Sequence, residues 1–363
     1  MTGIRRVLTV NAGSSSLKLR LLDGDAVVVS SDVPSAGAGF DVDSLQEFTS
    51  GSAIDAVGHR VVHGGTRFTA AARLDDEVEQ AIRDLTALAP LHQPKSLAGI
   101  DAVGALLPGV PAVACFDTAF HTDLPEAAST YALPQEWRER WPLRRFGFHG
   151  LSHSYASRRA AELADRPLAE LRVVVCHLGA GASLCAVQGG RSVDTTMGFT
   201  PLEGLVMATR SGSVDPGLLL WLQEQGGLSA HDVTDALEHR SGLLGLGGSA
   251  DLQALLERDD PVARLAVGVY LHRLVGSVAA MAAAMGGLDA LVFTGGVGEG
   301  AAGLRLAVAE RLAFLGVRVD PALNDAAPTD GEVSPPDAPV RSFVVQARED
   351  LEMAREVRAV LAG

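Results

Sequence analysis

Apolar and polar residues alternate along the chain with two periods, one typical of strands and one typical of helices. Ile4 to Val10 is an apolar run that predicts a strand, and the segment NAGSSS separates it from a second apolar run, Leu17 to Leu22. This pattern predicts a β-hairpin. The same unit recurs about half a chain later, where HLGAGAS separates Val173 to Cys176 from Leu184 to Val187. A repeat at this spacing is what a duplicated domain would produce.

Predicted strands alternate with helical segments, which indicates an α/β protein. Leu74 to Ala89 places its apolar residues on one helical face and stops before Pro90, so we predict a surface helix there. Ala112 to Phe116 and Leu288 to Phe293 are predicted buried strands, the first ending at Asp117 and the second at TGGVGEG. Ligands of open α/β sheets gather at such strand ends.

The last part of the chain contains two segments of different character. Residues 321–340 are rich in proline, aspartate and alanine and predict a surface loop. From Asp350 onward, apolar residues recur at helical spacing. We expect a terminal helix that docks back on the first domain.

Length and composition predict a two-domain globular protein. The chain has 363 residues, of which 47% are hydrophobic and 20% charged. This length suits two domains with a core each, and this composition excludes a disordered protein. The formal net charge of −14 opposes binding to nucleic acid or anionic lipid, which reward clustered lysine and arginine. We therefore expect no nucleic-acid partner and no membrane partner.

Cysteine usage and the N-terminal residues predict a cytoplasmic location. Cys115, Cys176 and Cys185 are too few for a disulfide framework and lack zinc-site spacing. The start, MTGIRRVLTV, has no apolar stretch of signal-peptide length. The Ala- and Met-rich run from Leu274 to Leu288 is the best membrane candidate, but it contains Ser277 and glycines, so we predict a buried helix.

Three glycine-rich segments, each following a predicted strand, offer backbone N–H groups to phosphates. NAGSSSLK, from Asn11 to Lys18, adds three hydroxyls and a lysine, and it is not the Walker pattern, which joins a strand to a helix. HLGAGAS and TGGVGEG are the second and third glycine-rich turns. Each one alone is explained equally well as an ordinary turn. Three such turns in one chain favour a nucleotide site.

Two arginines and several histidines lie in segments of small or polar residues. Arg60 lies in GHRVVHGG and Arg210 in MATRSGSVDP, and a guanidinium group can bind carboxylate or phosphate oxygens through two nitrogens. FGFHGLSH contains His149, and FDTAFH contains Asp117 and His121. A single arginine is more often a surface ion pair, and a single buried histidine is more often structural. The recurrence of histidines in glycine-rich or strand-end segments favours a functional role.

These segments together resemble the acetate kinase family across nearly the whole chain. The motifs are, in order, NAGSSSLK, GHRVVHGG, LAPLH, FDTAFH, FGFHG, MGFTPLEG, TRSGSVDP, FTGGVGEG and REDLEMARE. The resemblance implies an α/β fold of two duplicated RNase H-like domains, of the actin, Hsp70 and sugar kinase superfold, with the active site in an interdomain cleft. It implies an N-terminal domain of residues 1–118 plus 351–363. Residues 119–350 would form a C-terminal domain with the nucleotide site and the dimer interface of a homodimer.

The family resemblance implies reversible, direct in-line transfer of the γ-phosphoryl group of ATP to acetate, giving acetyl phosphate and ADP. A carboxylate acceptor has a pKa of about 4 to 5, so no base is needed, and catalysis depends on cations and positioning. By resemblance, Arg60 and Arg210 would position acetate and bind phosphoryl oxygens, His149 would donate to the phosphoryl group, and Asp117 would orient this assembly. Asn11 and Glu349 resemble the family's site for Mg²⁺ or Mn²⁺.

The same resemblance implies three sets of binding residues. The phosphate path would be lined by Ser14, Ser16 and Lys18. The apolar pocket around the acetate methyl group would be formed by Val62, Leu91, Phe148 and Pro201. Nucleotide contacts would come from His177, Gly179, Gly181, Asp251, Gly296, Val297 and Gly298.

The chain departs from the common family pattern at several positions near these residues. The departures are Gln93, Leu151, Ala180, Gln253, Gly300 and Arg348. The set of Arg60, Asp117, His149, Arg210 and Glu349 is intact. We therefore expect catalysis to be preserved, with changes in nucleotide affinity or in the preferred phosphoryl donor.

Three other functions remain open on the sequence alone. A small apolar pocket discriminates poorly between acids that differ by one methylene, so a propionate or short-chain fatty acid kinase is an alternative. A sugar or glycerol kinase of the same superfold would use Asp117 as a base for a hydroxyl acceptor. A nucleotide-gated binding protein or chaperone would show no transfer to acetate.

Overall fold

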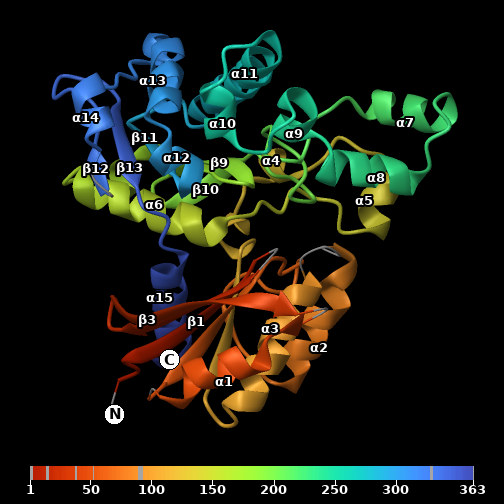
Figure 1. Ribbon diagram of the computed structural model, residues 1–363, viewed down its shortest axis with the longest axis vertical. Coiled ribbons are helices and arrows are strands. Elements are labelled where there is room, and N and C mark those ends of the chain that lie inside the picture. Colours follow the sequence, from red (N-terminus) through yellow and green to blue (C-terminus); the bar gives the residue numbers. More distant parts are fainter. Residues whose placement is uncertain are drawn as a thin grey trace. The chain divides into compact units, whose positions relative to one another are not determined.

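The computed structural model describes residues 3–13, 16–36, 39–51, 53–88, 93–327 and 330–362, which form two compact units (Figure 1). The first unit comprises Met1–Thr122, Phe148–Tyr155 and Arg348–Gly363, and the second comprises Asp123–Gly147 and Ala156–Ala347. The first unit therefore includes residues 148–155, which the predicted division at residue 118 assigns to the second domain.

The first unit contains a seven-stranded mixed sheet in the order β4-β3-β2-β1-β5-β7-β6. Strands β1 to β3 form an antiparallel meander, and β1, β5 and β7 are parallel. The predicted N-terminal hairpin is confirmed, although its first strand runs two residues further along the chain than predicted. The strands are β1 (Arg6–Ala12), β2 (Ser16–Asp23), β3 (Ala26–Ala36), β4 (Gly39–Phe40), β5 (Ala56–Val61), β6 (Ala72–Arg73) and β7 (Ala112–Phe116).

Helices cover both faces of this sheet (Figure 1). α1 (Val42–Ser50), α2 (Asp76–Asp84) and α3 (Gln93–Leu106) pack on one face, and α15 (Glu349–Ala362) packs on the other. On the α15 side, Met353 and Val357 contact strand residues of the core, which confirms the predicted docking of the terminal helix on the first domain. Burial of such apolar side chains stabilises the unit by about 1.5–3 kcal/mol each.

The predicted single helix from Leu74 to Ala89 is wrong in its extent. The α-helix spans only Asp76–Asp84, and the chain then tightens into a 3₁₀ turn, η1 (Leu85–Leu88). The N–H of Leu85 bonds to the carbonyls of both Ile82 and Arg83, which is the geometry of a tightening last turn. Ala89 lies outside the described residues.

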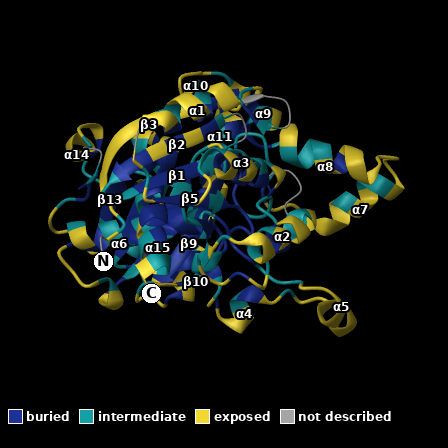
Figure 2. Cartoon of the chain, turned by 90° about the horizontal axis from the view of Figure 1, so that it is seen from below, coloured by how far each residue is buried: buried dark blue, intermediate teal, exposed yellow. Residues whose placement is uncertain are grey.

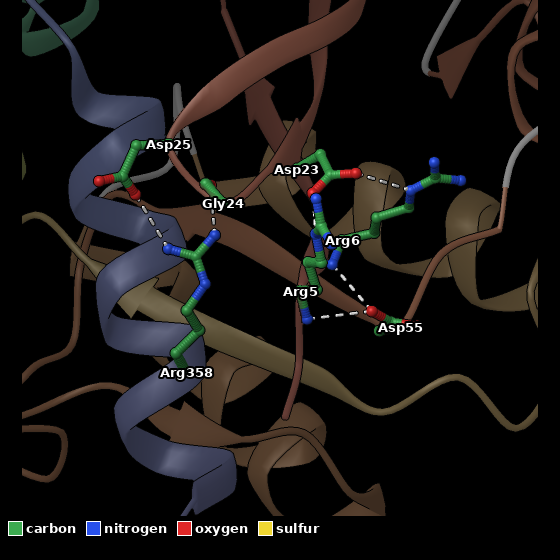
Figure 3. A network of polar contacts seen from close by, with 7 residues as sticks. All are labelled: Arg5, Arg6, Asp23, Gly24, Asp25, Asp55 and Arg358. Atoms are coloured by element: carbon green, nitrogen blue, oxygen red, sulfur yellow. Dashed lines mark hydrogen bonds and ion pairs between the residues drawn. The ribbon is translucent and has the colours of Figure 1, made fainter. Parts of the chain in front are cut away.

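Polar contacts link the N-terminal and C-terminal segments of the chain to the rest of the first unit (Figure 3). Asp55 accepts hydrogen bonds from the backbone N–H groups of Arg5 and Arg6, at 3.0 and 2.8 Å. Arg358 of α15 reaches the turn between β2 and β3, where it donates to the Gly24 carbonyl and pairs with Asp25. The contacts of Arg358 therefore tie the C-terminal half of α15 to the sheet.

The second unit repeats the topology of the first. Its six-stranded sheet has the order β10-β9-β8-β11-β13-β12, with an antiparallel meander of β8 to β10, parallel β8, β11 and β13, and a short antiparallel edge strand. This repeated topology confirms the predicted duplication and the α/β class. The strands are β8 (Arg172–Leu178), β9 (Ala182–Gln188), β10 (Arg191–Thr195), β11 (Ala290–Thr294), β12 (Asp330–Glu332) and β13 (Arg341–Val345).

Most of the helices belong to the second unit, and α6 passes from the first unit into it. Figure 2 shows that α5 and α7 are largely exposed. The helices are α4 (Glu126–Ser129), α5 (Gln135–Arg140), α6 (Gly150–Leu163), α7 (Pro216–Glu224), α8 (Ala230–His239), α9 (Gly242–Gly247), α10 (Leu252–Leu256), α11 (Pro261–Ala284), α12 (Gly295–Gly300), α13 (Ala302–Arg311) and α14 (Pro321–Asp325).

Helix α11 corrects the extent of the predicted buried helix. It begins at Pro261 and ends at Ala284, before Leu288. By length and composition it is the one helix among the described residues that could span a membrane. It packs against strands β8 to β10 and helices α9, α10 and α13, and buries Tyr270 and Leu274. α11 is thus buried along one face only.

The turn predicted at TGGVGEG is wrong, and the loop predicted over residues 321–340 is wrong in part. TGGVGEG forms helix α12 instead of a turn; Gly295 has φ +80°, and a Cβ there would lie 2.7 Å from the Leu178 carbonyl oxygen. Residues 321–340 contain α14 and β12, not only loop. Buried Asn324 accepts a hydrogen bond from buried Arg305 at 2.7 Å, so this polar composition serves an internal network.

A half-buried carboxylate on α15 makes the first unit sensitive to pH. Burial raises the pKa of Glu356 to about 7, with a further increase from Glu352 and Asp117, while Cys115 and Arg355 lower it. A carboxyl group whose pKa is raised in the folded state stabilises the fold below its ordinary pKa of 4.5, and this contribution is lost as the pH rises through about 7.

We predict that Glu356→Gln removes this pH dependence. Between pH 5.5 and 8.5 the free energy of unfolding of the wild type should fall by about 2 kcal/mol more than that of the variant, because one pKa unit corresponds to about 1.4 kcal/mol. Urea unfolding at both pH values measures the difference. Glu47→Gln, at an exposed position of α1, is the control and should follow the wild type. Parallel pH profiles for the wild type and Glu356→Gln would contradict the prediction.

Candidate active site

Three polar side chains lie at the carboxyl ends of the parallel strands of the first sheet. Asn11 lies near the end of β1, Arg60 near the end of β5, and Asp117 directly after β7. Because these strands are neighbours in the order β1-β5-β7, their ends bring the three side chains together. The sequence prediction that ligand groups gather after Phe116 therefore has a structural basis.

Arg60 is the centre of a hydrogen-bonded chain of four side chains. Its Nε lies 3.1 Å from both carboxylate oxygens of Asp117, and its Nη2 also donates to Oδ2. Its Nη1 donates to Asn11 Oδ1 at 3.1 Å, and Asn11 Nδ2 donates to Glu349 Oε2 at 2.9 Å. Four residues that are far apart in the sequence thus form one network within the first unit.

The charges of this network are only partly hydrated. The Arg60 side chain is 17% exposed and that of Asp117 is 1% exposed. Burial alone would lower the pKa of Arg60, but the carboxylates of Asp117 and Glu349 raise it above its usual range, so Arg60 stays charged. Burial raises the pKa of Asp117, and Arg60 opposes that increase. Each ion makes the burial of the other possible.

His149 lies beside this network at the start of α6. Its backbone N–H donates to the Asp117 carboxylate, and the N–H of Gly150 donates to the Asp117 carbonyl at 2.9 Å. A Cβ on Gly150 would lie 2.3 Å from that carbonyl oxygen, so only glycine allows this close approach. His149 itself has φ +57°, in the left-handed region. The structure therefore brings together Arg60, Asp117 and His149, three of the four predicted catalytic residues.

The fourth, Arg210, belongs to the second unit. Its Nη1 donates to the Pro201 carbonyl at 2.8 Å, and its Nε lies 3.7 Å from Glu238 Oε2. Burial lowers the pKa of Arg210, and Glu238 raises it. Arg210 and Pro201, predicted for phosphoryl transfer and for the acetate pocket, are therefore neighbours.

The other predicted acetate-pocket residues are apolar and buried where the structure describes them. Val62 follows β5 and Phe148 precedes His149. The Phe148 ring meets the edge of His63 at a centroid distance of 5.5 Å. Gln93 holds this region, since its Nε2 donates to the His63 carbonyl at 3.1 Å. Leu91 lies outside the described residues.

Of the predicted phosphate-path residues, Ser16 and Lys18 are described and Ser14 is not. Ser16 begins β2, and its carbonyl accepts a hydrogen bond from the Gly13 N–H at 2.8 Å. Lys18 is exposed and pairs with Asn11 across the hairpin, so both side chains are on the same face of the sheet.

The second unit has a pocket of about 360 Å³ at the ends of β8 and β11. This volume lies in the range of small-molecule sites, about 300–1,000 Å³. It is lined by Gly179, Ala180, Asp251, Leu252, Gln253, Gly296, Val297, Gly300 and Ala301. Four of the predicted nucleotide residues are therefore in its wall, whereas His177, Gly181 and Gly298 are not among the lining residues. The departures at Ala180, Gln253 and Gly300 all lie in this one pocket.

The remaining departures from the family pattern have local explanations. Leu151 is buried in the core under α15, with Val7 and Met353, so its apolar side chain suits its surroundings. Arg348 pairs with Asp350, with Nε and Oδ1 2.9 Å apart. Gln93 is buried and bonds the backbone of His63, as described above.

The donor set around Glu349 suits a hard divalent cation. Within the described ranges, no group of three or more His, Cys, Asp or Glu side chains is arranged to hold a metal ion. Mg²⁺ generally takes only one or two carboxylates from the protein and completes its shell with water and substrate phosphates. The Glu349 carboxylate and the Asn11 amide, which are hydrogen-bonded neighbours, fit that mode of binding.

His121, for which the sequence predicts no specific role, is part of the same assembly. It ends the short 3₁₀ helix η2 (Ala119–His121) and is fully buried. Its Nε2 lies 3.0 Å from the carbonyl oxygen of Phe148. The motif FDTAFH marked the segment, but the contact depends on tertiary structure and has no sequence signal of its own.

Comparisons with known proteins agree on one family. The model of the Acetokinase family matches residues 35–355. The acetate kinase of Gloeobacter violaceus is 50% identical over 310 residues, which are 84% of this chain and 76% of that protein. The crystal structure of Porphyromonas gingivalis acetate kinase has a TM-score of 0.91 at 36% identity, covering 98% of this chain and 99% of that one. A propionate kinase from Francisella tularensis subsp. tularensis has a TM-score of 0.91 at 34% identity, with the same coverage.

We predict that Asp117→Ala lowers the free energy of unfolding by about 3–5 kcal/mol, because it leaves the guanidinium of Arg60 buried without its main counter-ion. Asp101→Ala is the matched control, since Asp101 forms an exposed ion pair with Arg83 and should cost no more than about 1 kcal/mol. Urea unfolding of both variants measures the two costs. Equal costs would show that burial of the Arg60–Asp117 pair does not matter.

Proposed function

The chain belongs to the acetokinase family, and we propose that it catalyses the reversible transfer of the γ-phosphoryl group of ATP to acetate, giving acetyl phosphate and ADP. As a member of this family it is a kinase that uses ATP. The proposed reaction is a direct in-line displacement by the acetate carboxylate. We infer that it takes place in the cytoplasm.

The observation that carries this proposal is that the Asp117 carboxylate is already engaged in hydrogen bonds with other groups of the protein. Both of its carboxylate oxygens bond to Arg60, and the carboxylate also accepts the His149 backbone N–H. A carboxylate whose two oxygens are engaged in these bonds is poorly placed to take the proton of a hydroxyl acceptor. A carboxylic acid acceptor needs no base, because it is already ionised at neutral pH. The geometry therefore favours acyl phosphate formation over the sugar kinase alternative.

The chain's own residues supply positioning and positive charge. By the family resemblance, Arg60, which Asp117 fixes, and Arg210 would bind the acceptor carboxylate and the equatorial oxygens of the phosphoryl group. His149 donates a hydrogen bond to that phosphoryl group as its charge develops. By the family resemblance, the acetate methyl group would be enclosed by Val62, Leu91, Phe148 and Pro201, which would exclude water there.

Mg²⁺ or Mn²⁺ would be held by Glu349 and Asn11, together with the substrate phosphates. When bound, such an ion neutralises the phosphate oxygens of the nucleotide and so reduces their repulsion of an anionic acceptor. Ser14, Ser16 and Lys18 would line the phosphate path.

The pocket of the second unit supports a nucleotide as the phosphoryl donor, with its nucleoside bound in this pocket. No lysine or arginine is among its lining residues, and Leu252 and Val297 are apolar. Such a wall suits a base and a ribose, with Asp251 as an acceptor for hydroxyl groups, better than it suits a polyanion. His177, Gly179, Gly181 and Gly298 would contact the adjoining phosphates.

A hydroxylamine trap for acyl phosphates tests the function. The purified protein is assayed with acetate, propionate and butyrate, each with ATP, GTP or pyrophosphate. We expect acyl hydroxamate with acetate and ATP, and lower activity with propionate, since one methylene changes binding by about 1–3 kcal/mol. Phosphorylation of a hydroxyl acceptor without acyl phosphate, or ATP hydrolysis without transfer, would overturn the proposal. A strong preference for pyrophosphate would overturn the assignment of the nucleoside pocket.

We predict that Arg60→Ala and Arg210→Ala each lower kcat by at least about 100-fold, because each removes a charge that stabilises the transferring phosphoryl group. Arg67→Ala is the control, since Arg67 is exposed and pairs with the exposed Glu77. Circular dichroism verifies that each variant is folded. Formation of acetyl phosphate at a near-normal rate by either variant would remove that arginine from the mechanism.

A homodimer is proposed from the exposed apolar side chains of the second unit. No residue of α7 is buried, yet it carries Leu218, Leu220 and Trp221, which are 47%, 58% and 56% exposed. We predict that Leu220→Asp weakens self-association, which sedimentation equilibrium measures, because it introduces a charge into an apolar surface. Arg138→Asp on the exposed α5 is a control. A wild-type protein that sediments as a monomer would overturn the proposal.

A further inference from the structure

The peptide unit that joins Phe148 to His149 is held at both of its ends. Its carbonyl oxygen, on Phe148, lies 3.0 Å from Nε2 of His121. Its N–H, on His149, donates to the carboxylate of Asp117. In a trans peptide the C=O and N–H bonds point in opposite directions. His121 and Asp117, which bind these two groups, therefore together oppose rotation of the peptide plane.

This rotation matters because the backbone of His149 is strained. Its φ of +57° lies in the left-handed region, which costs a residue with a Cβ about 1 kcal/mol or more. A flip of the preceding peptide plane is the smallest motion that would relieve the strain, since it changes φ of His149 and ψ of Phe148 and leaves the remaining chain in place. The native angle therefore persists only while the surrounding groups hold the plane.

The chemistry of His121 suits it to hold the carbonyl end. A carbonyl oxygen only accepts hydrogen bonds, so the contact requires a hydrogen on Nε2. Burial lowers the pKa of His121 to about 4, against the effect of the Phe148 carbonyl, so the ring is neutral at pH 7. His121 belongs to η2, which follows Asp117 by two residues. Both partners of the peptide therefore come from one short segment after β7.

We propose that His121 is a positioning residue for phosphoryl transfer, which holds the Phe148–His149 peptide so that the His149 imidazole points at the reacting phosphoryl group. This role rests on the proposed function, because it acts through His149. His121 itself touches no substrate in this scheme. Neighbouring rings support its own position, since Phe120 and His153 meet it edge-on at centroid distances of 5.6 and 5.7 Å.

Three substitutions distinguish positioning from general structural support. His121→Phe keeps the ring and removes the donor. His121→Gln places an amide N–H₂ near the position of Nε2, whereas His121→Asn, with a shorter side chain, does not reach the Phe148 carbonyl. We expect His121→Phe and His121→Asn to lower kcat by about 100-fold with little change in the KM of acetate, and His121→Gln to recover most of the loss. Equal activity of all three variants would overturn the proposal.

A double-mutant cycle tests whether the effect passes through His149. If His121 only orients His149, His121→Phe should lower kcat about 100-fold in the wild type and hardly at all in a His149→Ala background. Losses that multiply in the double variant would show an independent role and would overturn the proposal. A loss of activity caused by misfolding would also multiply with the loss from His149→Ala. The cycle therefore separates positioning of His149 from misfolding.

A structural measurement tests the same role without relying on catalytic activity. Crystal structures of the His121→Phe and His121→Gln variants report φ of residue 149 directly. We expect φ to leave the left-handed region in His121→Phe and to remain there in His121→Gln. An unchanged φ in His121→Phe would overturn the positioning role even if the chain proved to have another activity. Failure of the hydroxylamine trap in the wild type, by contrast, would overturn the proposed function and leave this structural result standing.

Discussion

The ion pair between Arg60 and Asp117 is the interaction on which the candidate active site depends. Asp117 is 1% exposed, and a carboxylate buried to this extent is stable only beside a cation with a matching geometry. The fork of Arg60 satisfies that condition, and in return the carboxylate fixes the guanidinium in one orientation. The same carboxylate holds the backbone of His149, so a single buried group aligns two of the predicted catalytic residues.

The sheet explains why these groups meet. Parallel strands deliver Arg60 and Asp117 at one edge, and α15 crosses the face beside them and begins with Glu349. This packing has a narrow tolerance, because a Cβ on Gly58 of β5 would lie 2.8 Å from a methyl group of Val357. Gly58, the first glycine in GHRVVHGG, therefore has a packing role, because it allows the terminal helix to approach the strand that carries Arg60.

The sequence could predict the elements of the fold better than the contacts between them. The hairpin around NAGSSS, the strand before Asp117 and the terminal helix are predictable from the local pattern of apolar and polar residues, because that pattern is strong in each segment. TGGVGEG was predicted as a turn because five of its seven residues are glycine or threonine, and such residues disfavour helices. It forms α12 with Gly295 and Gly298 packed against β8, a tertiary contact that outweighs helix propensity.

The candidate site shows the same limit. The residues that carry charge were predicted from their motifs, whereas His121 was only noticed, because its role depends on the carbonyl that it faces and not on a neighbour in the sequence. The resemblance alone implied that Asn11 and Glu349, 338 positions apart, lie together, and the hydrogen bond from Arg60 to Asn11 has no sequence signal at all. Motifs identify which groups take part, but the partners of each group follow from the tertiary fold.

The charge balance of the site also favours the proposed divalent cation. Arg60 contributes one positive charge, and Asp117 and Glu349 contribute two negative charges, so the network in the first unit carries a net charge of −1 when both carboxylates are ionised. Such a site would repel phosphate and acetate, in a protein whose overall formal charge is −14. A divalent cation beside Glu349 would change the local charge to +1. The negative charge of Asp117, which gives Arg60 its fixed orientation, thus reduces the positive charge available to the substrates, and this charge balance favours an added cation.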